Sequence, residues 1–332
     1  MSARVVRFPA FGGPEVLQVD AVDIGQPGPG EVRIAVHAFG LNRVEAMSRA
    51  GQYMPVTFPA RLGYEAAGVI EALGPGVTGW SVGDRVATLF GLDMERYGTY
   101  ADTLAYPADM LVPVAPSQSL VEAAASWMQY GTAYALVEIG RIAAGDAVVI
   151  NAASSSVGLA AIAIANDHGA VPIAVTRGRD KAAALRAAGA AHVIVSDEED
   201  VAARVRELTG GRGAQVAFDA VAGPGLTALM GAMAPKGIVI VYGMLGGYSA
   251  ELGLLALTGG NLTLRGFAAN LLVEEVDSRA RLVDYVGSRL ASGAFRPTLD
   301  RTFALEDIAE AHRRLESNRQ VGKIVVTTGR SA

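Results

Sequence analysis

The second half of the chain alternates short apolar stretches with helical ones, and this alternation constrains the fold more than any other feature. Strands are predicted at 147–151, 171–176, 192–196, 214–220 and 237–242. Helices are predicted between them, at about 155–168, 180–188, 199–209 and 224–233. Parallel strands joined by helices form a sheet that is covered on both faces. The sequence therefore predicts a doubly wound α/β domain, with one more strand at 261–267.

The first third of the chain is predicted to be rich in β-structure. Residues 31–40, EVRIAVHAFG, alternate branched apolar residues with more polar ones, which is the period of a half-buried strand. Glycine and proline punctuate residues 74–89, where short strands between turns are expected. Ser119 and Glu122 then have the spacing of a capping box, which predicts the start of a helix.

The end of the chain is too short to form a domain of its own. Helices are predicted near 274–291 and at 306–317, followed by a strand at 322–327. We expect this tail to return to the β-rich first part.

Composition excludes several classes of protein. The 332 residues are 51% hydrophobic and 18% charged, as in a folded chain of about two domains. The net charge of −5 and the absence of a long basic run argue against a nucleic-acid partner. The N-terminus lacks the apolar core of a signal peptide, and Asn151 and three serines interrupt the most apolar window, so we expect a cytoplasmic protein without a membrane partner.

The turn after the first α/β strand reads NAASSSVGLA, at 151–160. Dinucleotide-binding turns carry glycines that let backbone N–H groups approach the pyrophosphate. Ala153 and Ser155 replace the first two glycines, and Gly158 keeps the third. Serine is small, caps a helix and adds hydroxyl donors, so we expect the cofactor to contact Ser154, Ser155, Ser156, Val157 and Gly158. The alternative is a β–α turn without a ligand.

The end of the second α/β strand indicates which dinucleotide binds. NAD-binding folds place an acidic residue there to hold the ribose 2′-hydroxyl, whereas arginine accommodates a 2′-phosphate. This chain has Thr176, Arg177 and Lys181 in that segment, and its nearest acid, Asp180, lies beyond the strand. The segment predicts NADPH; the alternative is a solvated basic loop.

Five motifs in order carry a resemblance to a known family. They are FPAFGGPEVLQV (8–19), GPGEVRIAVHAFGLN (28–42), LGYEAAGVIEALGPGV (62–77), VGDRVA (82–87) and GTYADTLAYPA (98–108). Together they resemble the medium-chain dehydrogenase/reductase superfamily, and within it the zinc-independent quinone oxidoreductases. The resemblance implies a GroES-like catalytic domain at 1–124 and 265–332, with a Rossmann NADP-binding domain at 125–264. It also implies an active cleft between the two domains and a homodimer that pairs through the strand at 261–267.

The resemblance also bears on metal binding. Zinc-using members of the superfamily hold the metal with a cysteine and with the histidine of a GHE motif. This chain has no cysteine, and Asn42 and Tyr64 stand at those two positions. The resemblance thus implies hydride transfer from NADPH, without zinc, to a quinone or an α,β-unsaturated carbonyl, a small molecule whose conjugation spreads the arriving charge.

Individual site residues follow from the same resemblance. Asn42, Tyr53 and Tyr64 are the candidate catalytic residues, and Asn42 approaches either the nicotinamide ribose or the substrate oxygen. Tyr64 is either the donor to that oxygen or a lid that narrows the pocket. The nicotinamide is expected to contact Thr132, Tyr242 and Gly243.

Two other functions remain open from the sequence. One is an enoyl reductase that acts on acyl thioesters by the same hydride chemistry. The other is a cofactor-binding structural protein of the crystallin type. Aromatic residues around Thr132, namely Trp127, Tyr130 and Tyr134, have the spacing of helical core residues.

Overall fold

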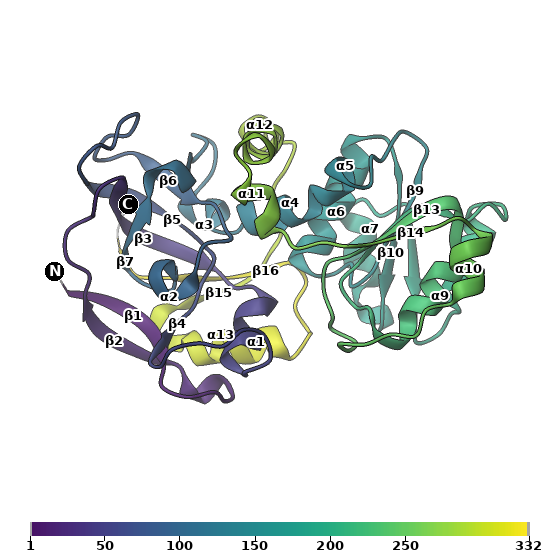
Figure 1. Cartoon of the computed structure of the whole chain (residues 1–332), viewed down its shortest axis with the longest axis horizontal. Coiled ribbons are helices and arrows are strands. Elements are labelled where there is room, and N and C mark those ends of the chain that lie inside the picture. Colours follow the sequence, from purple (N-terminus) through teal and green to yellow (C-terminus); the bar gives the residue numbers. More distant parts are fainter. Residues whose placement is uncertain (1, 331–332) are drawn as a thin grey trace. The chain divides into compact units, whose positions relative to one another are not determined.

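A six-stranded parallel sheet forms the centre of residues Gln129–Ala269 (Figure 1). The computed structural model, which describes residues 2–330, orders the strands β11-β10-β9-β12-β13-β14. Their bounds are β9 (Ala147–Ile150), β10 (Val171–Thr176), β11 (His192–Val195), β12 (Ala214–Asp219), β13 (Met233–Val241) and β14 (Thr263–Gly266). The connecting helices are α6 (Ser156–Asp167), α7 (Ala182–Ala187), α8 (Val201–Leu208), α9 (Leu226–Gly231) and α10 (Leu254–Gly259). The predicted doubly wound fold is confirmed.

The core of this sheet explains why its strands read as continuous apolar runs. All four residues of β9 are buried, because helices cover a parallel sheet on both faces. Val149, Ile173, Ile194 and Val239 belong to one buried cluster that includes residues from both the strands and the helices. The outermost strand β14 is mostly exposed.

Strand β13 begins earlier than the sequence predicts. The helix predicted to reach 233 ends at Gly231, and the strand predicted from 237 starts at Met233. Met233 already pairs with Ala214, and the register then shifts before Val216. Lys236 adopts a left-handed backbone with φ of 65° in this irregular stretch, which is why its sequence lacks a strand pattern.

Residues Met1–Met128 and Asn270–Ala332 form the other compact unit. Its larger sheet has the order β15-β16-β3-β5-β6-β8, with β7 paired to β3, and a smaller sheet has the order β2-β1-β4. The strands are β1 (Ser2–Phe8), β2 (Gln18–Asp23), β3 (Glu31–Gly40), β4 (Ala60–Arg61), β5 (Glu65–Leu73), β6 (Arg85–Thr88), β7 (Thr103–Pro107), β8 (Leu111–Pro113), β15 (Leu299–Ala304) and β16 (Lys323–Thr327). Its helices are α1 (Arg43–Arg49), α2 (Met94–Tyr97), α3 (Leu120–Ala123), α11 (Asn270–Glu274), α12 (Val276–Ser292) and α13 (Ile308–Glu316).

The chain's tail returns to the first part, as predicted. Strand β16 runs antiparallel to β3, with Val325 opposite Gly40. The division between the units falls at Met128, within α4 (Trp127–Ala133), and at Ala269. The capping box predicted at Ser119 is present, since the Ser119 hydroxyl accepts the N–H of Glu122 at 3.2 Å.

Strand β3 differs from the half-buried strand that its sequence suggests. The expected alternation holds only as far as Arg33, and every residue from Ile34 to Gly40 is buried. Strands β5, β7 and β16 pair with β3, and α3 packs against it, so its second half has no solvent-facing side.

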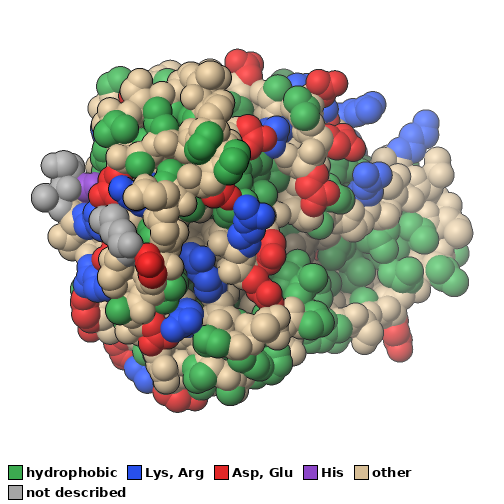
Figure 2. Space-filling model, turned by 60° about the vertical axis from the view of Figure 1, so that its left-hand side comes forward, with side chains coloured by type: hydrophobic (Ala, Val, Ile, Leu, Met, Phe, Trp, Pro, Cys, Tyr) green, Lys and Arg blue, Asp and Glu red, His purple; other side chains and the backbone are tan. Residues whose placement is uncertain are grey.

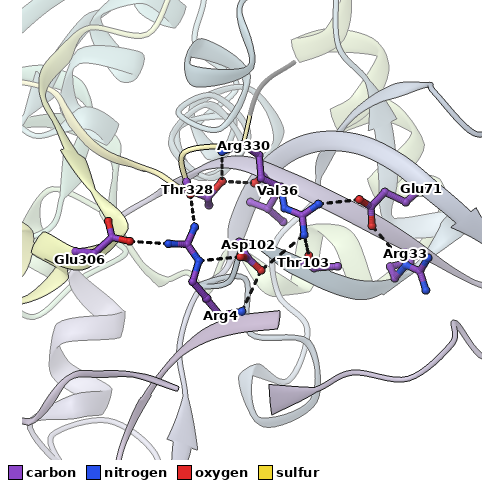
Figure 3. Close-up of polar contacts among 9 residues, drawn as sticks. All are labelled: Arg4, Arg33, Val36, Glu71, Asp102, Thr103, Glu306, Thr328 and Arg330. Carbon is purple, nitrogen blue, oxygen red and sulfur yellow. Dashed lines mark hydrogen bonds and ion pairs between the residues drawn. The ribbon is translucent and has the colours of Figure 1, made fainter. Parts of the chain in front are cut away.

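Charged side chains fasten the two ends of this unit (Figure 3). Arg4 on β1 donates from Nε to Asp102 at 2.9 Å, and its Nη1 pairs with Glu306 at 2.5 Å. Arg330, near the C-terminus, pairs with Glu71 at 2.7 Å.

On the face drawn in Figure 2, basic and acidic side chains are interspersed rather than gathered by sign. Within residues 2–330, no helix has the length and apolar character needed to cross a bilayer.

Candidate functional site

The site residues predicted from the sequence fall into two sets, one in each compact unit. In the α/β unit, the loop that follows β9 is tied to the end of β12. Asn151 donates from Nδ2 to Asp219 Oδ1 at 3.0 Å, and the two Asp219 oxygens accept the N–H groups of Val221 and Ala222 at 2.8 and 3.0 Å. This arrangement fixes the carboxyl edge of two neighbouring strands, which is where open α/β sheets bind ligands.

The serine turn leads directly into α6. Ser155 is the N-cap, and its hydroxyl accepts the N–H of Gly158 at 3.0 Å. A Cβ placed on Gly158 would lie 2.5 Å from the carbonyl oxygen of Ala153, so only glycine allows this close approach. The close packing expected at the third glycine is therefore present at Gly158, and the Ser155 hydroxyl caps the helix that begins there.

The residues after β13 face the same turn. The Tyr242 ring stacks on Phe218 with 4.0 Å between centroids. Burial and the Asp219 carboxylate raise the pKa of the Tyr242 phenol, while the Ser155 hydroxyl opposes that shift. A Cβ on Gly243 would lie 2.7 Å from the carbonyl oxygen of Ala220, which explains a glycine at this position.

The three cations that follow β10 have different surroundings. Arg177 is exposed, and its guanidinium has no hydrogen bond or ion pair with any residue in the described range 2–330. Arg179 pairs with Glu198 at the surface. Lys181 places its Nζ 3.3 Å from the Ser154 hydroxyl, so it links the basic segment to the serine turn. Thr176 is buried.

Thr132 lies in the helix α4 and is 6% exposed. The neighbouring Trp127, Tyr130 and Tyr134 are buried, as expected of helical core residues. These aromatic side chains therefore serve packing.

In the β-rich unit, Asn42 lies within a cluster of buried charges. The Lys323 ammonium donates to Asn42 Oδ1 at 2.6 Å and also pairs with Glu65, although both charged side chains are 1% exposed. Asn42 donates from Nδ2 to Glu45 at 3.1 Å and to Glu65 at 3.3 Å. Both amide hydrogens of Asn42 are thus already used inside the protein.

Tyr64 differs from Asn42 because its hydroxyl is available. Its backbone N–H donates to Glu45 Oε1 at 3.0 Å, but its phenol makes no hydrogen bond with any residue between 2 and 330. Burial, followed by nearby Tyr53 and Glu45, raises the pKa of this phenol, so it stays protonated at neutral pH. Tyr53 itself is 46% exposed.

Several members of this cluster escaped sequence reasoning. Glu45, Glu65, Tyr100 and Lys323 were not predicted as site residues, yet all are buried. One signal existed: Lys323 begins the apolar strand KIVVT, and a lysine that is buried with such a strand requires a partner.

The residues present do not fit a zinc ion. The two positions that carry ligands in zinc-using relatives hold an amide and a phenol, and the amide oxygen already accepts from Lys323. Across residues 2–330, no group of three or more His, Cys, Asp or Glu side chains is arranged to hold a metal. His312 is buried beside Arg49, and burial lowers its pKa to about 3.

Comparisons with known proteins agree with the fold and the motifs. Residues 28–116 match the family described as alcohol dehydrogenase GroES-like domain, and residues 188–326 match the one described as zinc-binding dehydrogenase. The chain is 31% identical to a quinone oxidoreductase of Pseudomonas aeruginosa, over 98% of this chain and 99% of that protein. It is 31% identical to a 2-haloacrylate reductase of a Burkholderia species, over 95% and 96% of the two chains. A crystal structure of Escherichia coli quinone oxidoreductase complexed with NADPH superimposes with a TM-score of 0.90, at 28% identity over 98% of this chain and 99% of that one.

Proposed function

This chain belongs to the quinone oxidoreductase branch of the medium-chain dehydrogenase/reductase superfamily, and we propose that it transfers hydride from NADPH to a quinone or an α,β-unsaturated carbonyl without zinc. Two observations together carry the proposal: the neutral Tyr64 hydroxyl has no hydrogen bond with any residue from 2 to 330, and the Asn42 side chain is held by protein groups. Such a site can donate one hydrogen bond to a carbonyl oxygen, but it cannot polarise that carbonyl as a metal would.

The cofactor is assigned to the α/β unit. NADPH supplies a hydride when it is bound. The serine turn, from Ser154 to Gly158, would hold the pyrophosphate with backbone N–H groups at the N-terminus of α6. Arg177 would pair with the 2′-phosphate, because its guanidinium has no partner in the described range 2–330. Lys181, which donates to the Ser154 hydroxyl, would add a second positive charge beside it. Thr132, Tyr242 and Gly243 are assigned to the nicotinamide end.

The acceptor is assigned to Tyr64 and Tyr53, with Asn42 in support. Hydride addition to a conjugated carbonyl moves negative charge onto its oxygen, and a neutral phenol can donate to that oxygen. The raised pKa of Tyr64 keeps the hydroxyl protonated for this role. Asn42 would act by fixing the surrounding groups rather than by donating, since both of its N–H groups are used.

A screen of acceptors tests the proposal. NADPH consumption would be measured with quinones, enones, 2-alkenals and acyl thioesters, and NADP⁺ reduction would be measured with simple alcohols as the control. We expect turnover with quinones or enones, unaffected by a chelator, and elemental analysis should find no zinc. Faster oxidation of simple alcohols than reduction of any conjugated acceptor would contradict the proposal, as would about one zinc per chain with activity lost to the chelator.

We also propose that the active form is a homodimer. Strand β14 ends the six-stranded sheet with an open, exposed edge, which is a site for pairing with another strand. The same unit exposes several large apolar side chains: Met244, Leu245, Tyr248, Leu252, Leu254 and Leu255. Light scattering should give the mass of a dimer for the wild type and a lower mass for Leu255→Glu; a monomeric wild type would contradict this part.

A further inference from the structure

Glu45 lies in the first turn of α1 and is fully buried. Four donors converge on its carboxylate. The backbone N–H of Asn42 donates to Oε2 at 2.6 Å, and the Tyr100 hydroxyl donates to the same oxygen at 2.5 Å. The backbone N–H of Tyr64 and the Asn42 side chain donate to Oε1 at 3.0 and 3.1 Å. One carboxylate therefore joins the two residues that stand where zinc-using relatives have metal ligands.

We propose that the ionised Glu45 carboxylate is the positioning residue of the acceptor site, because its Oε1 accepts from both the Asn42 side chain and the Tyr64 backbone N–H, while its Oε2 accepts the backbone N–H of Asn42. The inference rests on the proposed function only in that Tyr64 is taken as the donor to the acceptor. Glu45 itself has no role at the reacting atoms, and its effect reaches them through Tyr64 and Asn42.

A helix cap alone does not account for this arrangement. Ser119 and Glu122 form the same capping box at the start of α3, and there, among residues 2–330, the carboxylate accepts only from the Ser119 N–H and hydroxyl. Glu45 caps α1 in the same way but also reaches Tyr64, which lies in another segment of the chain. The additional hydrogen bond has no function in capping.

The surroundings of Glu45 set the pH at which its carboxyl group ionises. The Lys323 ammonium pairs with Glu65, and its charge also acts on Glu45, so two buried carboxylates share one cation. The buried Arg49 is already engaged with His312 and Glu316. Burial raises the pKa of Glu45 to about 7, against the opposing hydrogen bonds from Tyr100 and Asn42 and the charge of Lys323.

Protonation should loosen the link between the two residues. Each Glu45 oxygen accepts a backbone N–H, that of Asn42 on Oε2 and that of Tyr64 on Oε1. A backbone N–H cannot rotate away, so a proton on either oxygen must displace the second donor there, which is the Tyr100 hydroxyl on Oε2 or the Asn42 side-chain amide on Oε1. Hydrogen bonds to the ionised group are also about twice as strong as neutral ones. The tightly held site is therefore the one above the pKa.

Tyr100→Phe tests the inference, because it deletes one donor to Glu45 and keeps the ring that stacks on Phe39. Tyr106→Phe is the matched control: its buried hydroxyl donates to the carbonyl oxygen of Leu89 at 2.6 Å and does not touch Glu45. The measurement is a pH titration of the NMR signals of the Tyr64 backbone amide and the Asn42 side-chain amide in the full chain. Glu45→Gln is the second variant, since it has no carboxylate to titrate.

In the wild type, we expect both amide signals to titrate with one midpoint near pH 7. Loss of a hydrogen bond to the carboxylate should raise that midpoint by about one pH unit in Tyr100→Phe. Tyr106→Phe should keep the wild-type midpoint, and Glu45→Gln should abolish the titration. The acidic limb of kcat/KM should follow the same midpoints in the wild type and in Tyr100→Phe.

Two results would overturn the inference: amide signals that do not titrate between about pH 6 and 8, or equal midpoints in the two tyrosine variants. A pH-independent kcat/KM in an enzyme whose amides do titrate would also overturn it, because the link would then not affect the acceptor site. Failure of the proposed function looks different. In that case no conjugated acceptor would be reduced at any pH, whereas the amide titration would still decide whether Glu45 holds the two residues.

Discussion

The serine turn and the buried cluster around Asn42 solve opposite problems. In the turn, the Ser155 hydroxyl caps α6, and the guanidinium of its basic neighbour Arg177 has no partner within residues 2–330. In the cluster, the side chains of Asn42, Glu65 and Lys323 bind one another. A large charged cofactor is bound by charged and polar groups that have no protein partner before it binds. A small acceptor instead needs one available donor, held in place by buried polar groups that are already hydrogen-bonded to one another. Changes in the cluster should therefore affect stability and catalysis, and changes near the turn should affect cofactor binding.

The largest expected effect comes from Lys323→Met. This change leaves the Glu65 carboxylate buried without its cation, and breaking a buried ion pair in this way costs about 3–5 kcal/mol. Denaturant unfolding would measure the loss. The control is Arg313→Met, whose ion pair with Glu310 joins side chains that are 52% and 58% exposed and should contribute about 1 kcal/mol or less. Equal losses for the two variants would remove the contrast between the interior cluster and the surface.

Tyr64→Phe should have the next largest effect. It deletes the free hydroxyl and keeps the ring, so a donor used mainly in the transition state would be lost and kcat would fall by up to ~10²–10³. A lid would instead change chiefly KM and the range of acceptors. Steady-state kinetics with an enone separates the two roles, with NADPH binding as the check on folding. A parent-like kcat would assign the stabilisation of the oxyanion to another group.

Arg177→Ala should weaken NADPH binding and leave NADH almost unaffected. A lost charge-assisted hydrogen bond costs about 1.5–3 kcal/mol, which is about one to two decades in affinity. Arg179→Ala is the matched control, because that arginine is exposed on the same segment but already pairs with Glu198. Titration of both cofactors into all three proteins is the measurement. Equal losses for NADPH and NADH would show that Arg177 does not read the 2′-phosphate.

Gly158→Ala should have the smallest effect of the set. The added Cβ would lie 2.5 Å from the carbonyl oxygen of Ala153, so the turn must shift, at a cost of about 1–3 kcal/mol. We expect weaker binding of NADPH and of NADH alike. Gly231→Ala, at the end of α9, has nothing within 4 Å of the new Cβ and should bind both cofactors normally. Unchanged binding by Gly158→Ala would argue against the turn as the pyrophosphate site.

The sequence predicts the turn far better than the cluster, for a physical reason. Strand, turn and helix follow one another at 147–167, so local apolar patterning and residue size are enough to locate them. The cluster is assembled over long distances, and Lys323 and Asn42 are 281 residues apart. Nothing local marks Glu45 as buried, because its position in a helix cap is equally typical of a partly exposed residue such as Glu122. The early start of β13 was not predicted for a local reason: its first residues are irregular and have no alternating strand pattern.

The transfer of deuterium from NADPH tests the central claim most directly. The enzyme would be given an enone and each of the two C4-deuterated epimers of NADPH in turn, and the product would be analysed by NMR. The account predicts that one epimer places its deuterium on the β-carbon and that the α-carbon takes a proton from solvent. Deuterium on the carbonyl carbon, giving an allylic alcohol, would contradict the account, because that reaction requires the strong carbonyl polarisation that this site does not provide.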